Sequence, residues 1–141
     1  MRLVLSTPFD ILVDTQGVAR VQAEDATGSF GILDHHDRLV TVLSTSIVTW
    51  SVDGTEHFAA VDRGVLINDK QRGVRIASRR AEVSDDLERL ETQILESFRE
   101  AVDREERARQ RARRVELDLL KRLRRYAGHG RYGALPGVGQ G

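Results

Sequence analysis

Cysteine is absent from the 141-residue sequence, which excludes disulfide bonds, thiolate zinc sites and cysteine nucleophiles. The formal net charge is +0, so the chain as a whole has no electrostatic bias toward nucleic acid or a membrane surface. No apolar run approaches the ~20 residues that span a bilayer, and Pro8 and Asp10 interrupt the mildly apolar first residues. We therefore expect neither a signal peptide nor direct membrane insertion.

Familiar catalytic patterns are also missing. The sequence has no P-loop, no G-x-G-x-x-G and no G-x-S-x-G, and Gly28-Ser29-Phe30-Gly31 lacks the lysine that phosphate binding needs. Asp34-His35-His36-Asp37 sets four ionisable side chains in a row, but adjacent residues rarely point at one metal ion. The sequence therefore predicts no enzyme, no metal site and no cofactor, and it predicts a solvated turn or a partner-facing loop at this cluster.

Residues 1–83 have the pattern of a β domain. Apolar residues come in short runs rich in valine, isoleucine and threonine, and glycine and aspartate separate the runs. The stretch Val18–Ala23 nearly alternates, so we expect Ala19, Val21 and Ala23 on one face. Strand candidates recur about every 8–12 residues, which indicates an antiparallel sandwich or barrel.

Two hairpins are predicted within this domain. The candidate strands Ile47–Val52 and Glu56–Val61 flank Asp53-Gly54, a strong hairpin signal because a type I′ turn needs positive φ at both central residues. The candidate strands Gly64–Asn68 and Val74–Ala77 flank a polar stretch and form the second hairpin.

From Ser84 the apolar period becomes that of a helix. The apolar face of this first helix comprises Leu87, Leu90, Ile94, Phe98 and Ala101. Ser84 and Asp85 are candidate caps, and Asp85 with Glu88 has capping-box spacing. Asp103 and Glu106 repeat that spacing, which predicts the start of a second helix that ends at Gly128 and Gly130. The apolar face of the second helix comprises Ala108, Ala112, Val115, Leu119, Leu123 and Tyr126.

Charge separates between these two segments. Eight acidic and two basic residues lie from Glu82 to Asp103, whereas ten basic and four acidic residues lie from Arg104 to Arg125. An acidic and a basic helix suit an antiparallel hairpin over residues 84–126. A single helix of ~40 residues is the alternative, because no glycine or proline enforces a turn. Residues 127–141 are rich in glycine and are expected to be a disordered tail.

The run of arginines from Arg107 to Arg114 permits a competing function. A cationic helix can follow nucleic-acid phosphates, so a β domain with a basic helical hairpin could bind nucleic acid or another acidic partner. The adjacent acidic segment and the absence of interleaved aromatic side chains favour a solvated, internally paired face instead.

The motif G-x-F-G-I-L-x-x-H at residues 28–36, between short strands and a helical region, resembles the epsilon subunit of rotary F-type ATP synthases. Leu5–Pro8, Val61–Leu66 and Val74–Ala77 resemble three further segments of that family. Residues 23–31, 39–43 and 47–50 resemble its alternate bacterial subgroup, the N-ATPases. In place of the family's Pro-Gly-His, this chain has Asp34-His35-His36.

This resemblance implies a ten-stranded β-sandwich and a two-helix C-terminal domain, without catalysis by this chain. It implies a rotor subunit in the central stalk, peripheral to the cytoplasmic face of the bacterial inner membrane, in a complex that moves H⁺ or Na⁺. The sandwich would bind the gamma subunit along one side and rest its lower loops on the c-ring. The implied c-ring contacts are Gly28, Ser29, Phe30, Gly31, Ile32 and His36.

The resemblance also implies a regulatory helix. In some bacterial members the C-terminal helices rise toward the alpha/beta hexamer and inhibit ATP hydrolysis through basic side chains. The residues here that correspond are Arg107, Arg109, Arg111, Arg113, Arg114, Lys121, Arg122, Arg124 and Arg125. The segment Leu117–Arg122 matches the family's ATP-binding motif only in part, so we expect weak or no ATP binding.

Overall fold

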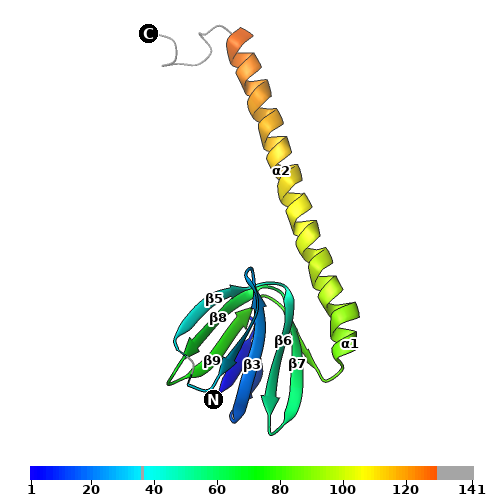
Figure 1. Ribbon diagram of the computed structural model, residues 1–141. Coiled ribbons are helices and arrows are strands. Elements are labelled where there is room, and N and C mark those ends of the chain that lie inside the picture. Colours follow the sequence, from blue (N-terminus) through cyan, green and yellow to red (C-terminus); the bar gives the residue numbers. More distant parts are fainter. Residues whose placement is uncertain (36, 130–141) are drawn as a thin grey trace. The chain divides into compact units, whose positions relative to one another are not determined.

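The computed structural model describes residues 1–35 and 37–129, and it contains ten strands followed by a helical segment (Figure 1). The chain divides into two compact units, Met1–Ala101 and Val102–Gly141. The strands are β1 (Leu3–Ser6), β2 (Ile11–Thr15), β3 (Val18–Asp25), β4 (Gly28–Leu33), β5 (Leu39–Leu43), β6 (Ser46–Val52), β7 (Thr55–Val61), β8 (Gly64–Asp69), β9 (Gly73–Ser78) and β10 (Ala81–Ser84). The helical elements are α1 (Leu87–Arg89), the π-helical turn η1 (Leu90–Ile94) and α2 (Leu95–His129).

The strands form two halves of one hydrogen-bonded array, in the order β10-β7-β6-β3-β5-β8-β9-β1-β2, with β4 added beside β3. The halves meet at one residue pair, Asp25 of β3 with Leu43 of β5. We call β4-β3-β6-β7-β10 the first sheet and β5-β8-β9-β1-β2 the second sheet. The predicted β-sandwich is confirmed, with one departure: β1 pairs with β9 in parallel. No hairpin joins these two strands, so their relative direction is set by packing and not by a turn.

The core lies between the two sheets. The first sheet contributes the fully buried side chains of Val21 and Val48, and the second sheet contributes those of Leu5, Leu66 and Ile76. Alternate residues of most strands point into this core, as expected for antiparallel strands with one covered face. Burial of these aliphatic side chains is the main stabilising contribution to the sandwich.

Both predicted hairpins are present. β6 pairs with β7 in antiparallel register, and the turn residues Asp53 and Gly54 have φ of 51° and 78°. Both values are positive, as a type I′ turn requires. β8 pairs with β9 in the same way, from Gly64 with Ser78 to Asp69 with Gly73.

The prediction for β3 was wrong at one position. Val21 and Ala23 are buried as expected, but Ala19 is exposed and Val18 takes the inward position. The register of β3 against β6 shifts between Val18 and Arg20, which marks a β-bulge. A bulge adds one residue to one strand and reverses which residues face the core, and strict alternation in the sequence does not reveal it.

The predicted helical hairpin is wrong, and the single helix is what the structure shows. α2 runs without interruption from Leu95 to His129 and passes through Asp103, where a second helix was expected to begin. Residues 85–126 contain neither glycine nor proline, so nothing in the backbone stops the helix. Acid–base pairs within α2 are local instead, as in Arg109 with Glu106 at 2.9 Å, three residues apart. The disordered tail predicted from residue 127 is wrong for residues 127–129, which belong to α2, and its remainder from residue 130 onward lies outside the described residues.

The first helical turn is capped one residue later than predicted. The Asp86 carboxylate accepts a hydrogen bond from the Arg89 backbone N–H at 3.1 Å, and the Asp86 N–H donates to Ser84 Oγ at 3.1 Å. Asp85 is instead 3.5 Å from Nδ1 of His57 on β7. An exposed aspartate can cap or pair, and sequence spacing does not distinguish the two roles.

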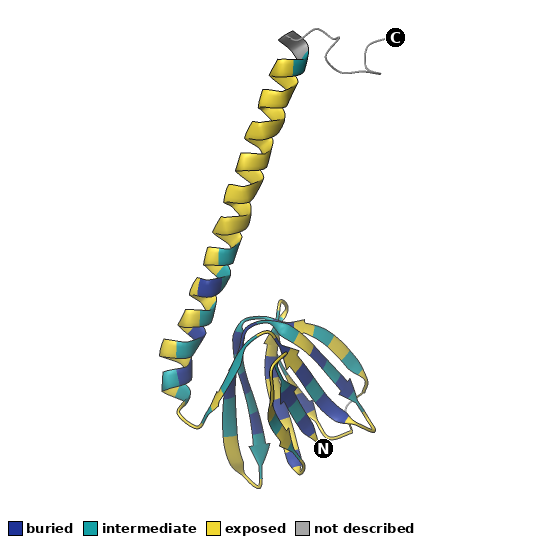
Figure 2. Cartoon of the chain, turned by 180° about the vertical axis from the view of Figure 1, so that it is seen from behind, coloured by how far each residue is buried: buried dark blue, intermediate teal, exposed yellow. Residues whose placement is uncertain are grey.

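The start of the helical segment covers the outer face of the first sheet. The turn η1 contacts β7 and β10, and Leu90 is fully buried there. Ala60 on β7 is also fully buried, although its neighbours Ala59 and Val61 face the opposite way, into the core. Leu95 and Ala101 continue this buried face into α2, as the alternating colours along the lower helix show (Figure 2). The first compact unit therefore includes the beginning of the helix.

A buried carboxylate ties these parts together. Asp62, which follows β7, is 0% exposed, and its Oδ2 accepts hydrogen bonds from Arg80 Nε at 2.9 Å and Nη2 at 2.5 Å. Its Oδ1 accepts from Arg63 Nε at 3.1 Å and Thr45 Oγ1 at 3.3 Å. The Arg80 guanidinium also lies over the ring of Phe98 in α2, 5.7 Å from the centroid. Asp62 thus links the β7–β8 connection to the β9–β10 connection, and Arg80 extends this link to α2.

The electrostatics of Asp62 follow from these contacts. Burial by itself raises the pKa of the Asp62 carboxyl, but the hydrogen bonds and charges of Arg80 and Arg63 outweigh it and lower the pKa below its ordinary value. The ionised form therefore stabilises the fold at neutral pH, and this contribution is lost as the pH falls through the depressed pKa.

We predict that Asp62→Asn lowers the free energy of unfolding by about 3 kcal/mol at pH 7, because it leaves two arginines without their buried counter-charge. The difference from the wild type narrows as the pH falls below about 4, because the Asp62 carboxyl of the unfolded chain then binds a proton, and it is lost as the pH passes the lower pKa of the folded chain. Urea denaturation at pH 7 and pH 3 measures both values. The exposed Asp103→Asn serves as the control, and an equal difference at the two pH values would contradict the prediction.

Gly64 allows a test of the close packing between β8 and β9. Its φ is 158°, and a Cβ built there would overlap the backbone oxygen of Ala77. Gly64→Ala is expected to lower the free energy of unfolding by about 2–3 kcal/mol, because backbone cannot move aside as a flexible side chain can. Gly31→Ala is the matched control, since its Cβ would meet only ordinary contacts beginning at 3.8 Å. Equal melting temperatures for the two variants would show that Gly64 is not required for close packing.

Candidate partner-binding surfaces

The stretch Gly28–Ile32, where the resemblance implied contact loops, forms most of strand β4. β4 pairs with β3, and it has no other partner among the strands that the structure describes. Ser29 and Gly31 are exposed, whereas Phe30 is half-buried against the core. Ile32 is fully buried, so its side chain supports the strand and is not offered to a partner. Gly28 has φ of 119°, a conformation that side-chain-bearing residues rarely adopt, and it allows the tight turn from β3 into β4.

A second turn follows β4 at the histidine cluster. His35 has φ of 67°, and Asp34 Oδ1 accepts a hydrogen bond from the His35 N–H at 3.2 Å. This left-handed conformation is uncommon for residues other than glycine, although histidine adopts it more often than most. His36, the remaining predicted contact, lies outside the described residues.

An exposed apolar surface lies on the outer side of the second sheet, and the sequence motifs did not predict it. We call Val40, Val42, Val65 and Ile67 the valine face. Val42 pairs with Val65 and Val40 with Ile67 across β5 and β8, so the four side chains adjoin on one side of the sheet. Val40 is 63% exposed and Val42 is 68% exposed. Contiguous exposed apolar groups on a rigid sheet are typical of a protein-binding surface.

The signal for this surface was present in the sequence. β5 reads LVTVL and β8 begins GVLI, so apolar residues occupy both faces of each strand. A strand with one solvated face alternates apolar and polar residues, and a continuous apolar run indicates cover on both faces. The core covers only one face here.

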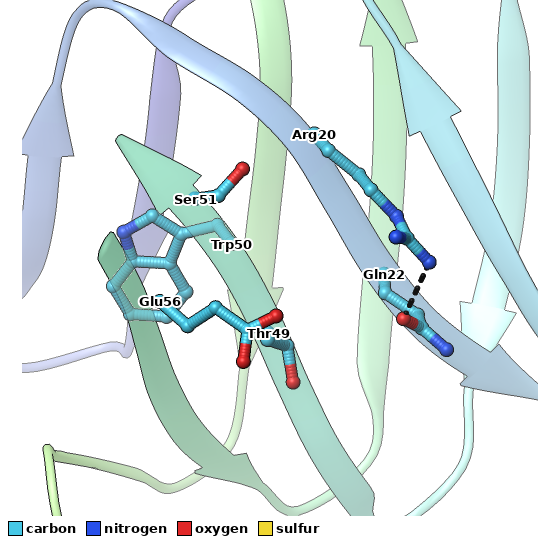
Figure 3. A pocket seen from close by; sticks show the side chains of 6 residues that line it. All are labelled: Arg20, Gln22, Thr49, Trp50, Ser51 and Glu56. Carbon is cyan, nitrogen blue, oxygen red and sulfur yellow. Dashed lines mark hydrogen bonds between the residues drawn. The ribbon is translucent and has the colours of Figure 1, made fainter. Parts of the chain in front are cut away.

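The outer face of the first sheet differs in chemistry. A shallow groove there is lined mainly by polar side chains from β3, β6 and β7, together with Trp50, which belongs to the buried core (Figure 3). Arg20 Nη2 donates to Gln22 Oε1 at 2.8 Å, and Glu56 supplies the one carboxylate in the lining. The groove thus carries one cation and one anion, and it does not have the single-sign charge that attracts a polyanion.

The arginine-rich part of α2 is exposed along its whole length. Every side chain from Glu106 to Tyr126 is exposed, including the predicted inhibitory residues and the apolar Leu119 and Leu123 (Figure 2). The structure therefore keeps these basic residues together on one helix. It does not bring them to the acidic segment as the hairpin prediction required.

Within residues 1–35 and 37–129, no helix is long and apolar enough to cross a bilayer. In the same part of the chain, no three histidine, aspartate or glutamate side chains gather where they could hold a metal ion.

Comparison with known proteins agrees with these observations. Residues 1–84 match the family described as "ATP synthase, Delta/Epsilon chain, beta-sandwich domain". The chain is 37% identical to ATP synthase epsilon chain 2 of Paraburkholderia xenovorans, over 89% of this chain and 91% of that protein. It is 32% identical to ATP synthase epsilon chain 2 of Cereibacter sphaeroides, over 89% of this chain and 87% of that protein.

Solved structures support the fold alone. A chain of the Euglena gracilis mitochondrial ATP synthase (OSCP/F1/c-ring) matches with a TM-score of 0.57 and 19% identity, over 72% of this chain and 61% of that chain. A chain of the Tetrahymena thermophila mitochondrial ATP synthase (central stalk/c-ring) matches with a TM-score of 0.50 and 16% identity, over 57% and 64%. None of these matches supports the nucleic-acid-binding alternative. The chain therefore belongs to the family of epsilon subunits of F-type ATP synthases.

Proposed function

We propose that this chain is a non-catalytic rotor subunit of the central stalk, which joins the gamma subunit to the c-ring of an N-ATPase-like bacterial enzyme. The observation that carries the proposal is the valine face on a sandwich of the epsilon family. A rotor subunit must be gripped rigidly by its neighbours, and an apolar sheet surface provides such a grip through burial of area. The two solved structures that share the fold come from assemblies whose names include the c-ring.

The gamma subunit is the proposed partner of the valine face. β5 and β8 hold its four side chains in fixed register, so the surface is already formed before binding. Covering Val40 and Val42 would remove two largely exposed valines from water, and each is worth on the order of 1 kcal/mol or more.

The c-ring is the proposed partner of β4 and the turn that follows it. Ser29 is exposed and polar, and Gly28 and Gly31 have no side chains, so a partner can approach the backbone of β4 closely. The turn at Asp34-His35 adds polar groups that can hydrogen-bond to a polar loop, and His36 belongs to the same proposed contact. We propose that this contact holds the chain peripherally, on the cytoplasmic face of the membrane that holds the ring.

The arginine-rich part of α2 is proposed to act on the alpha/beta hexamer. Its basic side chains are exposed on one helix and can meet acidic surfaces of the hexamer, while the exposed Leu119 and Leu123 can be covered in the same contact. We propose residues 1–83 as the sandwich domain, residues 84–126 as the regulatory domain and residues 127–141 as a tail. Binding of ATP to these helices is not expected.

We predict that Val42→Lys weakens binding to the gamma subunit of the same operon at least about tenfold, because it puts a charge where the proposed complex buries an apolar side chain. Co-elution on a sizing column at ~150 mM salt, followed by titration calorimetry, measures the effect. Val115→Lys, at a valine of α2 that is 59% exposed, is the matched control. A wild-type chain that elutes apart from gamma, or a Val42→Lys variant that binds normally, would overturn the proposal for this surface.

Inhibition is tested by a truncation placed according to the structure. A cut after Val83 would remove Leu90 and expose Ala60, so the cut belongs after Ala101, where the first compact unit ends. We expect this truncation to raise the ATPase rate of the reconstituted complex severalfold while the subunit stays bound. Substituting glutamine for Arg107, Arg109, Arg111, Arg113 and Arg114 in the full chain should reproduce the gain. An unchanged rate in both would show that the basic helix does not inhibit.

A further inference from the structure

Arg75 interrupts the apolar surface of the second sheet. It lies on β9, where its backbone pairs with Ile67 of the valine face on one side and with Val4 of β1 on the other. The row across the sheet therefore runs Val40, Ile67, Arg75, Val4. A cation in this row stands directly beside the surface proposed to bind gamma.

The Nε atom of Arg75 is a hydrogen-bond donor without an acceptor among the residues that the structure describes. The same atom is buried. A buried donor without an acceptor destabilises a fold, so such groups are uncommon and call for an explanation.

The carboxylates nearest in the sheet are already engaged. Asp14 is paired with Val4 in the β1–β2 register. Its Oδ1 accepts a hydrogen bond from Arg2 Nε at 2.9 Å, and its Oδ2 accepts one from Arg2 Nη2 at 2.8 Å. Asp69, two residues beyond Ile67, accepts the Gln71 N–H at 2.8 Å. The pKa of Asp14 is lowered by its hydrogen bond with Arg2, which is consistent with this bidentate pair. None of the described residues supplies an acceptor to Arg75 Nε, so a partner that covers the neighbouring valine face is a candidate source of a carboxylate for this guanidinium.

We propose that the gamma-subunit segment covering the valine face carries an aspartate or glutamate whose carboxylate pairs with Arg75. This inference rests on the proposed function, because gamma is the occupant assumed for that face. The apolar side chains on both sides of Arg75 would exclude water from the pair and strengthen it. The planar guanidinium donates to a carboxylate through a fixed fork of N–H groups, so the pair would set the register of gamma on the sheet. The valines would contribute burial of apolar area, which has no preferred direction.

The test compares three substitutions in the full chain by titration calorimetry against purified gamma. Arg75→Met keeps the length of the side chain and removes the charge, and we expect it to weaken binding at least tenfold. Arg75→Lys keeps the charge without the fork and should fall between Arg75→Met and the wild type. The melting temperature of free Arg75→Met should equal or exceed that of the wild type, because the free chain no longer buries an unpaired donor. Binding of Arg75→Met as tight as the wild type would overturn the inference.

Charge-neutralising substitutions in gamma identify the partner carboxylate. Each exposed aspartate or glutamate of gamma is changed to asparagine or glutamine and measured with wild-type and Arg75→Met chains. One of them should weaken wild-type binding and have no further effect with Arg75→Met, whereas additive effects at every position would contradict a direct pair. Failure of the proposed function has a different signature: the wild-type chain would elute apart from gamma, or Val42→Lys would bind gamma as tightly as the wild type does. Loss of binding in Val42→Lys together with normal binding of Arg75→Met would refute only the ion pair.

Discussion

The structure depends on the buried carboxylate of Asp62. Asp62 lies in the connection from β7 of the first sheet to β8 of the second, and Arg80 lies in the connection from β9 of the second sheet back to β10 of the first. The Ser78 hydroxyl lies 2.8 Å from the Arg63 carbonyl and 2.7 Å from the Arg80 carbonyl, so backbone as well as side chains joins the two crossings. The Asp62 N–H also donates to the Arg80 carbonyl at 2.9 Å. Among the described strands, one residue pair, Asp25 with Leu43, joins the two sheets in register. The contacts of Asp62 add a second link, because burial of apolar side chains alone does not fix how the sheets are aligned.

The two outer faces of the sandwich are used differently. The first sheet is covered in part by the start of the helical segment, through Leu90 over β7 and β10, and Arg80 connects that cover to Asp62 through its contact with Phe98. The second sheet presents the valine face instead. A sheet with apolar side chains on both faces is more stable when both faces are covered, and in our proposal the chain itself covers part of one face and the gamma subunit covers the other. The core of the sandwich is formed by the chain itself, whereas the cover of the valine face is the proposed contribution of the gamma subunit.

The helical segment shows how charge separation can mislead. An acidic segment followed by a basic one suits a hairpin, and each half also has its own capping-box spacing. Exposed ion pairs are worth only a few tenths of a kcal/mol each, whereas breaking a helix at Asp103 would leave several backbone hydrogen bonds unmade. Without glycine or proline at the junction, continuation through Asp103 is the less costly arrangement, and α2 extends to His129.

Sequence by itself determined the parts of this protein that depend on local chemistry. Asp53-Gly54 specified a turn with positive φ, alternation and short apolar runs specified the strands, and the motif at residues 28–36 pointed to the epsilon family. Tertiary structure alone decided the rest. The bulge that exposes Ala19, the burial of Ile32 and the parallel pairing of β1 with β9 depend on which strand lies next to which. The same holds for Asp62 and Arg80, whose roles arise from contact across 18 residues, and for Arg75, whose isolation is visible only when its neighbours are known. Periodicity reports which face a residue takes, but the partners on that face are fixed by packing in three dimensions.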